Sequence, residues 1–189
     1  MFAADLDGDG DLDVLSASVG DNTIAWHENL DGAGTFAPRR VVSTEVDGPY
    51  SVFAADVDGD GDLDVLSASA NDNTIAWYAN LDGAGTFGPQ RVVSTAANGP
   101  YSVFAADLDG DGDVDVLSAS VGDNTIALYE NLDGAGTFGP ERVISTTAAG
   151  AFSVFAADLD GDGDLDVLSA SLSDNKIAWY ENGGDGIAD

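Results

Sequence analysis

Short runs of small and apolar residues alternate with polar turns along the whole chain, and this pattern predicts strands throughout. In the third of four similar stretches, residues 102–106 form one apolar run and residues 115–120 (D-V-L-S-A-S) form the next. Residues 125–131 and 142–146 give two more, and Gly-Asp-Asn at 122–124 is typical of a tight hairpin. No segment shows sustained helical periodicity, so we expect an all-β fold.

The same pattern returns every 51 residues. Each return is marked by a phenylalanine: Phe2, Phe53, Phe104 and Phe155. Residues 2–52, 53–103 and 104–154 are complete units, and 155–189 is an incomplete fourth. Four short strands in about 50 residues are typical of one β-propeller blade. We therefore predict propeller blades of four antiparallel strands. A nine-residue calcium β-roll is the alternative, but its period does not match.

We interpret residues 1–189 as a single repeat array with one strand missing. The sequence supplies four first, second and third strands but only three fourth strands, because residues 182–186 depart from the N-L-D-G-A-G of the other units. A segment of a larger propeller or repeat assembly is our first expectation. A chain that pairs with its own copy into a ring of about eight blades is the second. A closed four-bladed ring or an open, filament-like stack is the third.

Each unit carries the nine-residue motif D-x-D-G-D-G-D-x-D directly after its first strand. Like charges about 4 Å apart near a protein surface oppose each other by about 4 kcal/mol. Calcium relieves such repulsion by accepting six to eight oxygen ligands at about 2.3–2.6 Å. We predict one Ca²⁺ in each loop, about four in all. The predicted ligands are Asp5, Asp7, Asp9, Asp11, Asp13, Asp56, Asp58, Asp60, Asp62, Asp64, Asp107, Asp109, Asp111, Asp113, Asp115, Asp158, Asp160, Asp162, Asp164 and Asp166.

The spacing gives each place in the loop a role. The first, third and fifth aspartates alternate along a tightly wound loop, so their carboxylates can converge on one point. The glycine at the sixth place allows a sharp turn at positive φ. The seventh aspartate would bind through its backbone carbonyl and leave its carboxylate facing solvent. The ninth would complete the shell.

Two other interpretations of the loop are less consistent with the sequence. An EF-hand requires a glutamate at place twelve, and the four units have serine there: Ser16, Ser67, Ser118 and Ser169. A solvated acidic turn would explain a single copy, because Asp and Gly are common in turns. Four copies with the same Asp and Gly places favour the calcium site.

The charge balance restricts the partners. Lys and Arg number 5 against 35 Asp and Glu, which gives a formal charge of −30. A surface this acidic argues against nucleic acid or an anionic membrane as the partner. Cysteine is absent, and no apolar run is long enough to span a membrane. We expect no signal peptide, because residues 1–4 already lie inside the repeat. Because loops of this type suit millimolar extracellular calcium, we expect a secreted or cell-surface protein.

The stretch F-A-A-D-L-D-G-D-G-D-L-D-V-L resembles the FG-GAP (VCBS-type) repeats of integrin α-subunit propellers and of many secreted microbial and algal proteins. The resemblance extends over essentially the whole chain. It implies a seven- or eight-bladed propeller with calcium between the first two strands of each blade, and a role in extracellular adhesion or in carbohydrate and protein recognition. Fewer than four complete units do not make such a ring alone. The family's ligands match the loop aspartates, with the seventh binding through its carbonyl.

Three other repeated positions need weighing. One position holds tryptophan in three units, at Trp26, Trp77 and Trp179, and leucine in the other, at Leu128. Because leucine replaces tryptophan, packing between blades is favoured over stacking on sugars. Arginine recurs once per unit, at Arg40, Arg91 and Arg142. We expect it to pair with local acids or stack on aromatic rings. His27 replaces a tyrosine, which indicates an incidental substitution.

Near-identical units favour a structural role, because repetition multiplies one interface. We predict a non-enzymatic, calcium-binding extracellular scaffold or adhesion module, in a larger assembly or filament. The alternative is a lectin-like module that binds glycan or protein in grooves between blades or at loops 46–50 and 97–101. An enzyme is the weakest hypothesis, because no unique catalytic constellation is visible. Expected partners are a protein or glycan ligand or further copies of the chain, without nucleic acid or membrane insertion.

Overall fold

The computed structural model describes residues 1–183, which form strands, turns and no helix, and therefore no helix that could span a membrane. The first sheet contains β1 (Phe2–Ala4), β2 (Asp13–Ser18), β3 (Thr23–His27) and β4 (Arg40–Ser43). The second contains β5 (Pro49–Ala55), β6 (Asp64–Ser69), β7 (Thr74–Tyr78) and β8 (Arg91–Ser94). The third contains β9 (Pro100–Ala106), β10 (Asp115–Ser120), β11 (Thr125–Tyr129) and β12 (Arg142–Ser145). The fourth contains β13 (Ala151–Ala157), β14 (Asp166–Ser171) and β15 (Lys176–Tyr180).

Every sheet is an antiparallel meander in which consecutive strands pair. The register repeats from unit to unit, so that the aspartate at the start of each second strand lies opposite the last alanine of the first strand. The hairpin between the second and third strands is as predicted, with Asn124 at a φ of 63°. The all-β expectation is therefore confirmed, with four sheets of three or four strands.

Three strand boundaries differ from the sequence prediction by one or two residues, and the smallest difference is that the fourth strand of the third unit ends at Ser145 rather than at residue 146. The first strand of the third unit begins at Pro100 rather than at residue 102, because a register shift at the end of β10 lets the pairing continue. Proline is tolerated there as the first residue of a strand. The third strand ends at Tyr129 rather than at residue 131. Asn131 leaves the ladder and bonds to the neighbouring loops instead.

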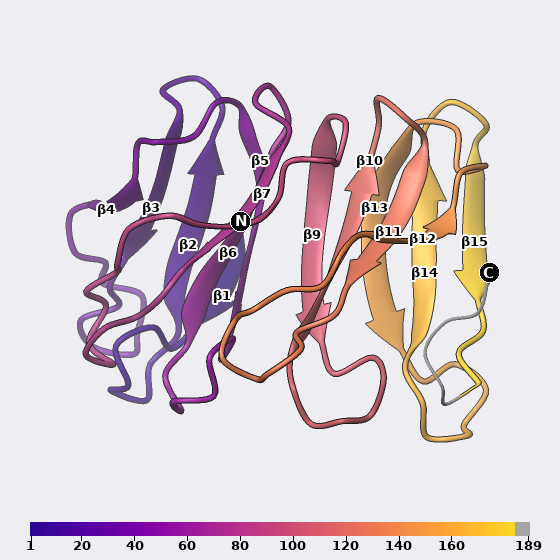
Figure 1. Cartoon of the computed structure of the whole chain (residues 1–189). Coiled ribbons are helices and arrows are strands. Elements are labelled where there is room, and N and C mark those ends of the chain that lie inside the picture. The colour runs from indigo at the N-terminus through magenta and orange to yellow at the C-terminus, as the bar shows by residue number, and fades with distance from the viewer. Residues whose placement is uncertain (184–189) are drawn as a thin grey trace.

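The four sheets stand side by side in chain order and do not close into a ring (Figure 1). Their first strands lie next to one another along the row. The phenylalanines that mark the repeat form a ladder there, with ring centroids 4.4, 4.8 and 4.7 Å apart from Phe2 through Phe53 and Phe104 to Phe155. The ladder holds the acidic loops of consecutive units in register at one end of the strands.

The hydrophobic core lies between the sheets rather than within one of them. Three clusters of buried side chains each join two consecutive units. Strands β6 and β10, which have a sheet on either side, are buried at every residue. This is why, after the first aspartate, both faces of these strands carry only small or apolar side chains. Strand β15 at the end of the row is mostly exposed.

Candidate metal centre

Each acidic loop connects the first and second strands of its sheet and brings three carboxylates together. In the first three loops these belong to the first, third and ninth aspartates, with one oxygen of each within 4.8 Å of the others. The groups are Asp5, Asp7 and Asp13; Asp56, Asp58 and Asp64; and Asp107, Asp109 and Asp115. In the fourth loop the group is Asp158, Asp160 and Asp162, and all three are exposed.

The fifth aspartate of the first three loops does not belong to these groups. Asp9 Oδ1 accepts the backbone N–H of Asp11 at 2.8 Å, and Asp60 and Asp111 make the same bond in their own loops. Asp162 makes the same bond in the fourth loop although it belongs to that group, so the bond stabilises the turn and does not distinguish ligands from other carboxylates.

The seventh aspartate lies differently from the prediction that its carboxylate faces solvent. The carboxylates of Asp11, Asp62 and Asp113 are half-buried against the first glycine of the D-G-A-G loop in the same unit, where a Cβ atom would clash with them. The cause is the D-G-A-G loop, which folds back over the acidic loop. Asp164 and Asp166 lie outside the group in the fourth unit.

The sixth-place glycines have the predicted conformation. Their φ values lie between 94° and 104° at Gly10, Gly61, Gly112 and Gly163, a region that side chains rarely adopt. The first aspartate uses the turn: Asp5 Oδ2 accepts the N–H of Gly10 at 2.9 Å, and its Oδ1 accepts the N–H of Gly8 at 2.8 Å. The loop backbone therefore winds around the first carboxylate.

The ninth aspartate anchors the loop to the sheet. Asp64 is completely buried; its Oδ2 accepts the N–H of Val57 at 3.0 Å, and its Oδ1 accepts the N–H of Asn80 at 2.8 Å. The equivalent pair of bonds occurs in all four units. The sequence predicted a ligand at this place but not the anchor.

An asparagine that sequence reasoning missed joins consecutive loops. Asn80 Nδ2 donates to the carbonyl of Leu6 in the preceding unit at 2.9 Å. Asn131 donates to Val57 at 2.9 Å, and Asn182 donates to Leu108 at 2.7 Å. Each acceptor directly follows the first aspartate of an acidic loop. The signal was visible, because asparagine occupies this position in all four units.

Burial disfavours the ionised form of several of these carboxylates in the absence of a cation. Desolvation raises the pKa of Asp64 and of Asp115 to about 6, although two backbone N–H groups act in the opposite direction on each. Burial and then the charge of Asp13 raise the pKa of Asp7. A bound cation would remove this conflict, because it stabilises the charged form of every carboxylate around it.

The fourth loop has a different electrostatic environment. The N–H of Asn182 lowers the pKa of Asp166, although the side chain is as buried as Asp64. The difference arises because no described sheet packs on the far side of the fourth unit, so fewer protein atoms surround the carboxylate. The exposed group in this loop is the least like the other three.

The residues present fit a hard dication such as calcium. The buried oxygens Asp7 Oδ1 and Asp58 Oδ1 have no hydrogen-bond partner. Ligands on opposite sides of a calcium ion are about 5 Å apart, given metal–oxygen distances of about 2.3–2.6 Å, and the groups fall within that span. The donors are all oxygen, which calcium prefers. The three carboxylates would hold the ion, and backbone carbonyls and water would complete its shell.

The other repeated side chains stabilise the contacts around the loops. Trp26 and Trp77 are buried between units, which confirms packing rather than sugar stacking for both. Arg40 lies over the Trp26 ring at 4.9 Å, and Arg91 over Trp77 at 4.5 Å. Arg40 pairs with Glu28, Arg142 with Glu130, and Arg91 reaches Asp58 at 3.9 Å. His27 Nδ1 lies 3.3 Å from the Ala37 carbonyl.

The sequence matches one family model in three consecutive, overlapping stretches. The model describes an FG-GAP-like repeat, and it matches residues 5–67, 60–118 and 107–169. The chain belongs to the FG-GAP-like repeat family. This confirms the family that the loop sequence resembles. No curated protein sequence matches this FG-GAP-like chain.

Several solved structures are similar to the FG-GAP-like chain. One is a lectin of Agrocybe aegerita, described as recognising non-reducing terminal N-acetylglucosamine: identity is 26%, the TM-score is 0.66, and the match covers 98% of this chain and 49% of the lectin chain. Another is the V. cholerae biofilm matrix protein Bap1, with 23% identity and a TM-score of 0.55; the match covers 98% of this chain and 27% of the Bap1 chain. A third is BBS1N, in a complex with ARL6DN, with 13% identity and a TM-score of 0.61; the match covers 99% of this chain and 54% of the BBS1N chain. The last two likenesses establish the fold alone.

Proposed function

We propose that this FG-GAP-like chain is a non-enzymatic, calcium-binding repeat module of the extracellular space, whose sheets are propeller blades and whose role is adhesion or scaffolding. The observation that carries the proposal is the group of three carboxylates that recurs once per unit. The similarity to a lectin, at 26% identity, supports a binding role. The repetition itself favours a structural use of the metal over catalysis.

Calcium would act by stabilising the fold. With calcium about tenfold above a Kd of ~10⁻⁴ M, each site adds ~1.4 kcal/mol to the free energy of unfolding. Four such sites would add at most ~6 kcal/mol, and less if the exposed fourth site is weaker, which is still comparable to the whole stability of a typical domain, about 5–15 kcal/mol. The loops would therefore make folding depend on the calcium concentration outside the cell.

The test is isothermal titration of calcium into protein stripped with EDTA. We expect three similar sites and a weaker fourth, because only the fourth group is fully exposed. Asp109→Asn should remove one of the similar sites. The matched control is Glu141→Gln, which removes one charge and gives the third unit the residue that the second unit has as Gln90. Titration without heat or saturation would contradict the proposal.

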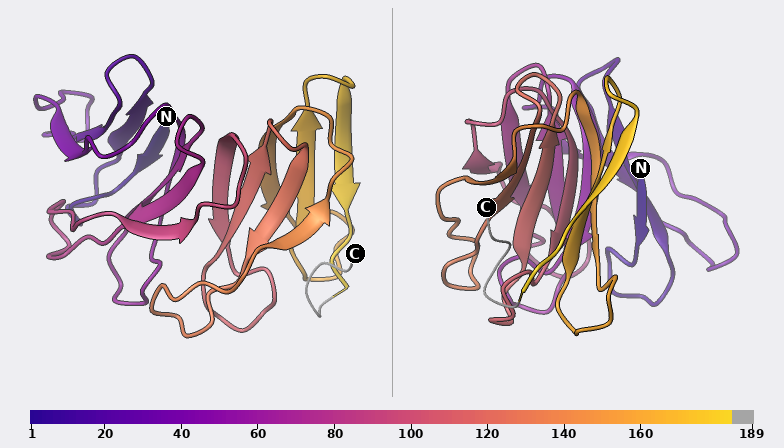
Figure 2. Two further views of the ribbon diagram at one scale, coloured as in Figure 1. Left: turned by 45° about the horizontal axis from the view of Figure 1, so that its top comes forward. Right: turned by 90° about the vertical axis from the view of Figure 1, so that its right-hand side faces the viewer.

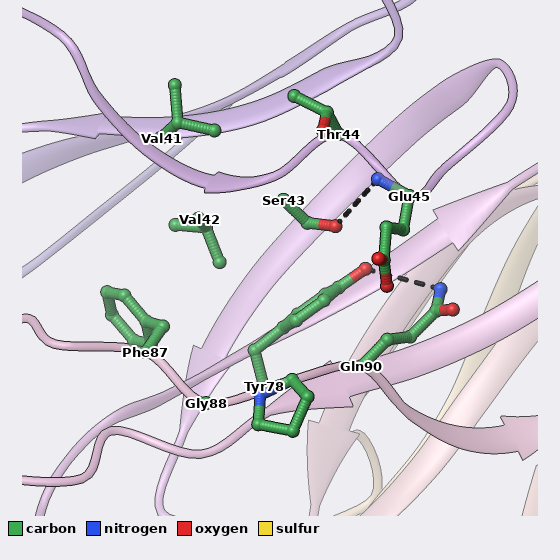
Figure 3. A pocket seen from close by; sticks show the side chains of 10 residues that line it. Val41, Val42, Ser43, Thr44, Glu45, Tyr78, Phe87, Gly88 and Gln90 are labelled. Carbon is green, nitrogen blue, oxygen red and sulfur yellow. Dashed lines mark hydrogen bonds between the residues drawn. The ribbon is translucent and has the colours of Figure 1, made fainter.

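A cavity between the first two units favours glycan binding as a second candidate. It measures about 360 Å³, within the range of small-molecule sites, and its lining includes Ser43, Glu45, Tyr78 and Gln90 (Figure 3). Gln90 Nε2 donates to the Tyr78 hydroxyl at 3.3 Å, and Ser43 Oγ accepts the N–H of Glu45 at 3.0 Å. Tyr78 is almost completely buried, so the aromatic ring open to a ligand is that of the half-buried Phe87. Polar groups next to such a ring are suited to sugar hydroxyls and apolar sugar faces.

A glycan array with calcium present tests this second candidate, with terminal N-acetylglucosamine among the probes. We expect binding that Gln90→Ala weakens and that Glu141→Gln, at the equivalent position of the next unit, leaves unchanged. An array without signal, or a signal that Gln90→Ala does not change, would reject the cavity as a glycan site.

A further inference from the structure

The fourth sheet has an apolar face that no other part of residues 1–183 covers. Ile177 is 83% exposed, Trp179 is 50% exposed and Leu159 is 47% exposed. At the equivalent positions of the first three units, the side chains are fully or almost fully buried against the next sheet. The view along the row shows the fourth sheet, in yellow, nearest the viewer (Figure 2, right). The face is thus built like an internal interface but has no described neighbour.

The internal interfaces show what such a face contacts. A Cβ atom on Gly85 would overlap Trp26 of the preceding unit, and one on Gly136 would overlap Trp77. Only glycine leaves room for the tryptophan ring. Phe87 adds an edge-on contact with Trp26, with ring centroids 6.5 Å apart. Both tryptophans therefore need a glycine from the next unit, and Trp26 also contacts a phenylalanine there.

The first unit presents the same glycine and phenylalanine positions without a tryptophan against them. Gly34 stands at the position of Gly85, and a Cβ atom there would meet nothing within 4 Å. Phe36 stands at the position of Phe87 and is exposed. Asn29 occupies the position from which Asn80 bonds to the preceding loop. One end of the described row thus has an open glycine site, and the other has a tryptophan with no glycine of residues 1–183 against it.

Among the first three units, tryptophan occurs only where the next unit has a glycine at the contact position. Trp26 precedes Gly85 and Trp77 precedes Gly136, each by 59 residues. The third unit has Leu128 instead, and the residue 59 positions later is Ile187 rather than glycine. The fourth unit returns to tryptophan at Trp179.

We propose that the two ends bind each other between two copies of this chain. The fourth sheet of one copy packs against the first sheet of a second copy, head to tail, with Trp179 against Gly34 and Phe36. The contact continues the interface that already joins consecutive units. One position of the fourth-sheet face is charged. Lys176 replaces the threonine that is buried in the other units, and it forms an ion pair with Asp174 of its own hairpin at 3.2 Å. Because each copy carries a formal charge of −30, added salt strengthens the contact by screening repulsion.

The test is sedimentation velocity of the calcium-saturated protein over a wide concentration range. The wild-type chain should form dimers or larger species. Ile177→Lys damages only the fourth-sheet face, and Phe36→Lys damages only the first-sheet face. Each variant alone should lower the association constant by at least about tenfold, as expected for a charge placed at the buried centre of an interface. An equimolar mixture of the two should form a heterodimer, because each supplies the face that the other lacks.

The matched control is Leu172→Lys. Its side chain is exposed on the same unit, but the equivalent positions are not buried at the internal interfaces, so association should be unchanged. Circular dichroism checks that every variant is folded, and Trp179→Ala provides a second substitution of the fourth-sheet face. A wild-type chain that stays monomeric overturns the proposal. Assembly that survives Phe36→Lys, or a mixture that stays monomeric, also overturns it, because either result excludes the head-to-tail contact.

Discussion

A single asparagine after each third strand connects the acidic loops to one another. The side chain of Asn131 donates to Val57 in the preceding unit and to Val114 in its own, and accepts the N–H of Gly136. All of these groups are near the predicted calcium sites. Because an unsatisfied buried polar group costs roughly 1–3 kcal/mol, this residue influences both the loop and the interface.

Asn131→Ala should destabilise the protein more than Asn29→Ala. Both variants lose the bonds within their own unit, but only Asn131 has a described bond to a preceding unit. We expect a difference of roughly 1–3 kcal/mol in the free energy of unfolding, from the carbonyl of Val57 that loses its partner. Urea unfolding of dilute, monomeric protein measures it. Equal effects of the two variants would show that the hydrogen bond between units contributes nothing to the free energy of unfolding.

The raised pKa values of the ninth aspartates predict a dependence on pH. The pKa of Asp64 and of Asp115 rises from 3.8 to about 6 in the metal-free fold, so the folded state binds protons more tightly than the unfolded chain. The stability from these two groups is complete below about pH 4 and is lost as the pH rises through about 6. Calcium needs the deprotonated carboxylates, so protons compete with it.

We therefore expect acid to stabilise the metal-free protein and to reduce the stabilisation that calcium provides. In EDTA, the melting temperature should be higher at about pH 5 than at about pH 7. The increase in melting temperature that calcium produces should be smaller at about pH 5. Thermal unfolding at the two pH values, with calcium and with EDTA, measures both. A calcium effect of the same size at both would contradict this account of the ninth aspartate.

At the scale of the elements, each sheet is stabilised by side chains and loops of the next unit that pack against it. The contact between tryptophan and glycine depends on the absence of a side chain at the second glycine of D-G-A-G. Gly136 has a φ of 81°, and it lies against Trp77. Leucine at the tryptophan position of the third unit indicated packing, but only the structure shows that the partner is a glycine in the next unit.

Gly136→Ala should destabilise the protein more than Gly34→Ala. Both positions have positive φ, so both variants carry backbone strain, but only the alanine at 136 would displace a tryptophan. Overpacking of this kind costs about 1–3 kcal/mol. Urea unfolding at concentrations where the chain is monomeric gives the difference. Two variants of equal stability would show that the tryptophan adjusts without cost, and would weaken the account of the interface.

At the scale of the whole molecule, the repeat made much of the structure predictable. The 51-residue period and the alternation of apolar runs with turns predicted the strands and the loop that carries the aspartates. The role of the fifth and seventh carboxylates and the bond from Asn131 to the preceding unit could not be predicted, because they depend on how one loop folds over another. The exposed fourth group likewise depends on packing, since its sequence is the same as in the other loops.

Thermal unfolding followed by circular dichroism tests most directly whether the acidic loops bind calcium and stabilise the fold. The protein is measured with millimolar calcium and again with excess EDTA, at the same pH and ionic strength. Three similar sites that add ~1.4 kcal/mol each, together with a weaker fourth, predict a large fall in the melting temperature on chelation, restored when calcium is added back. A melting temperature that is the same with calcium and with EDTA would contradict the account and would leave the loops as solvated acidic turns.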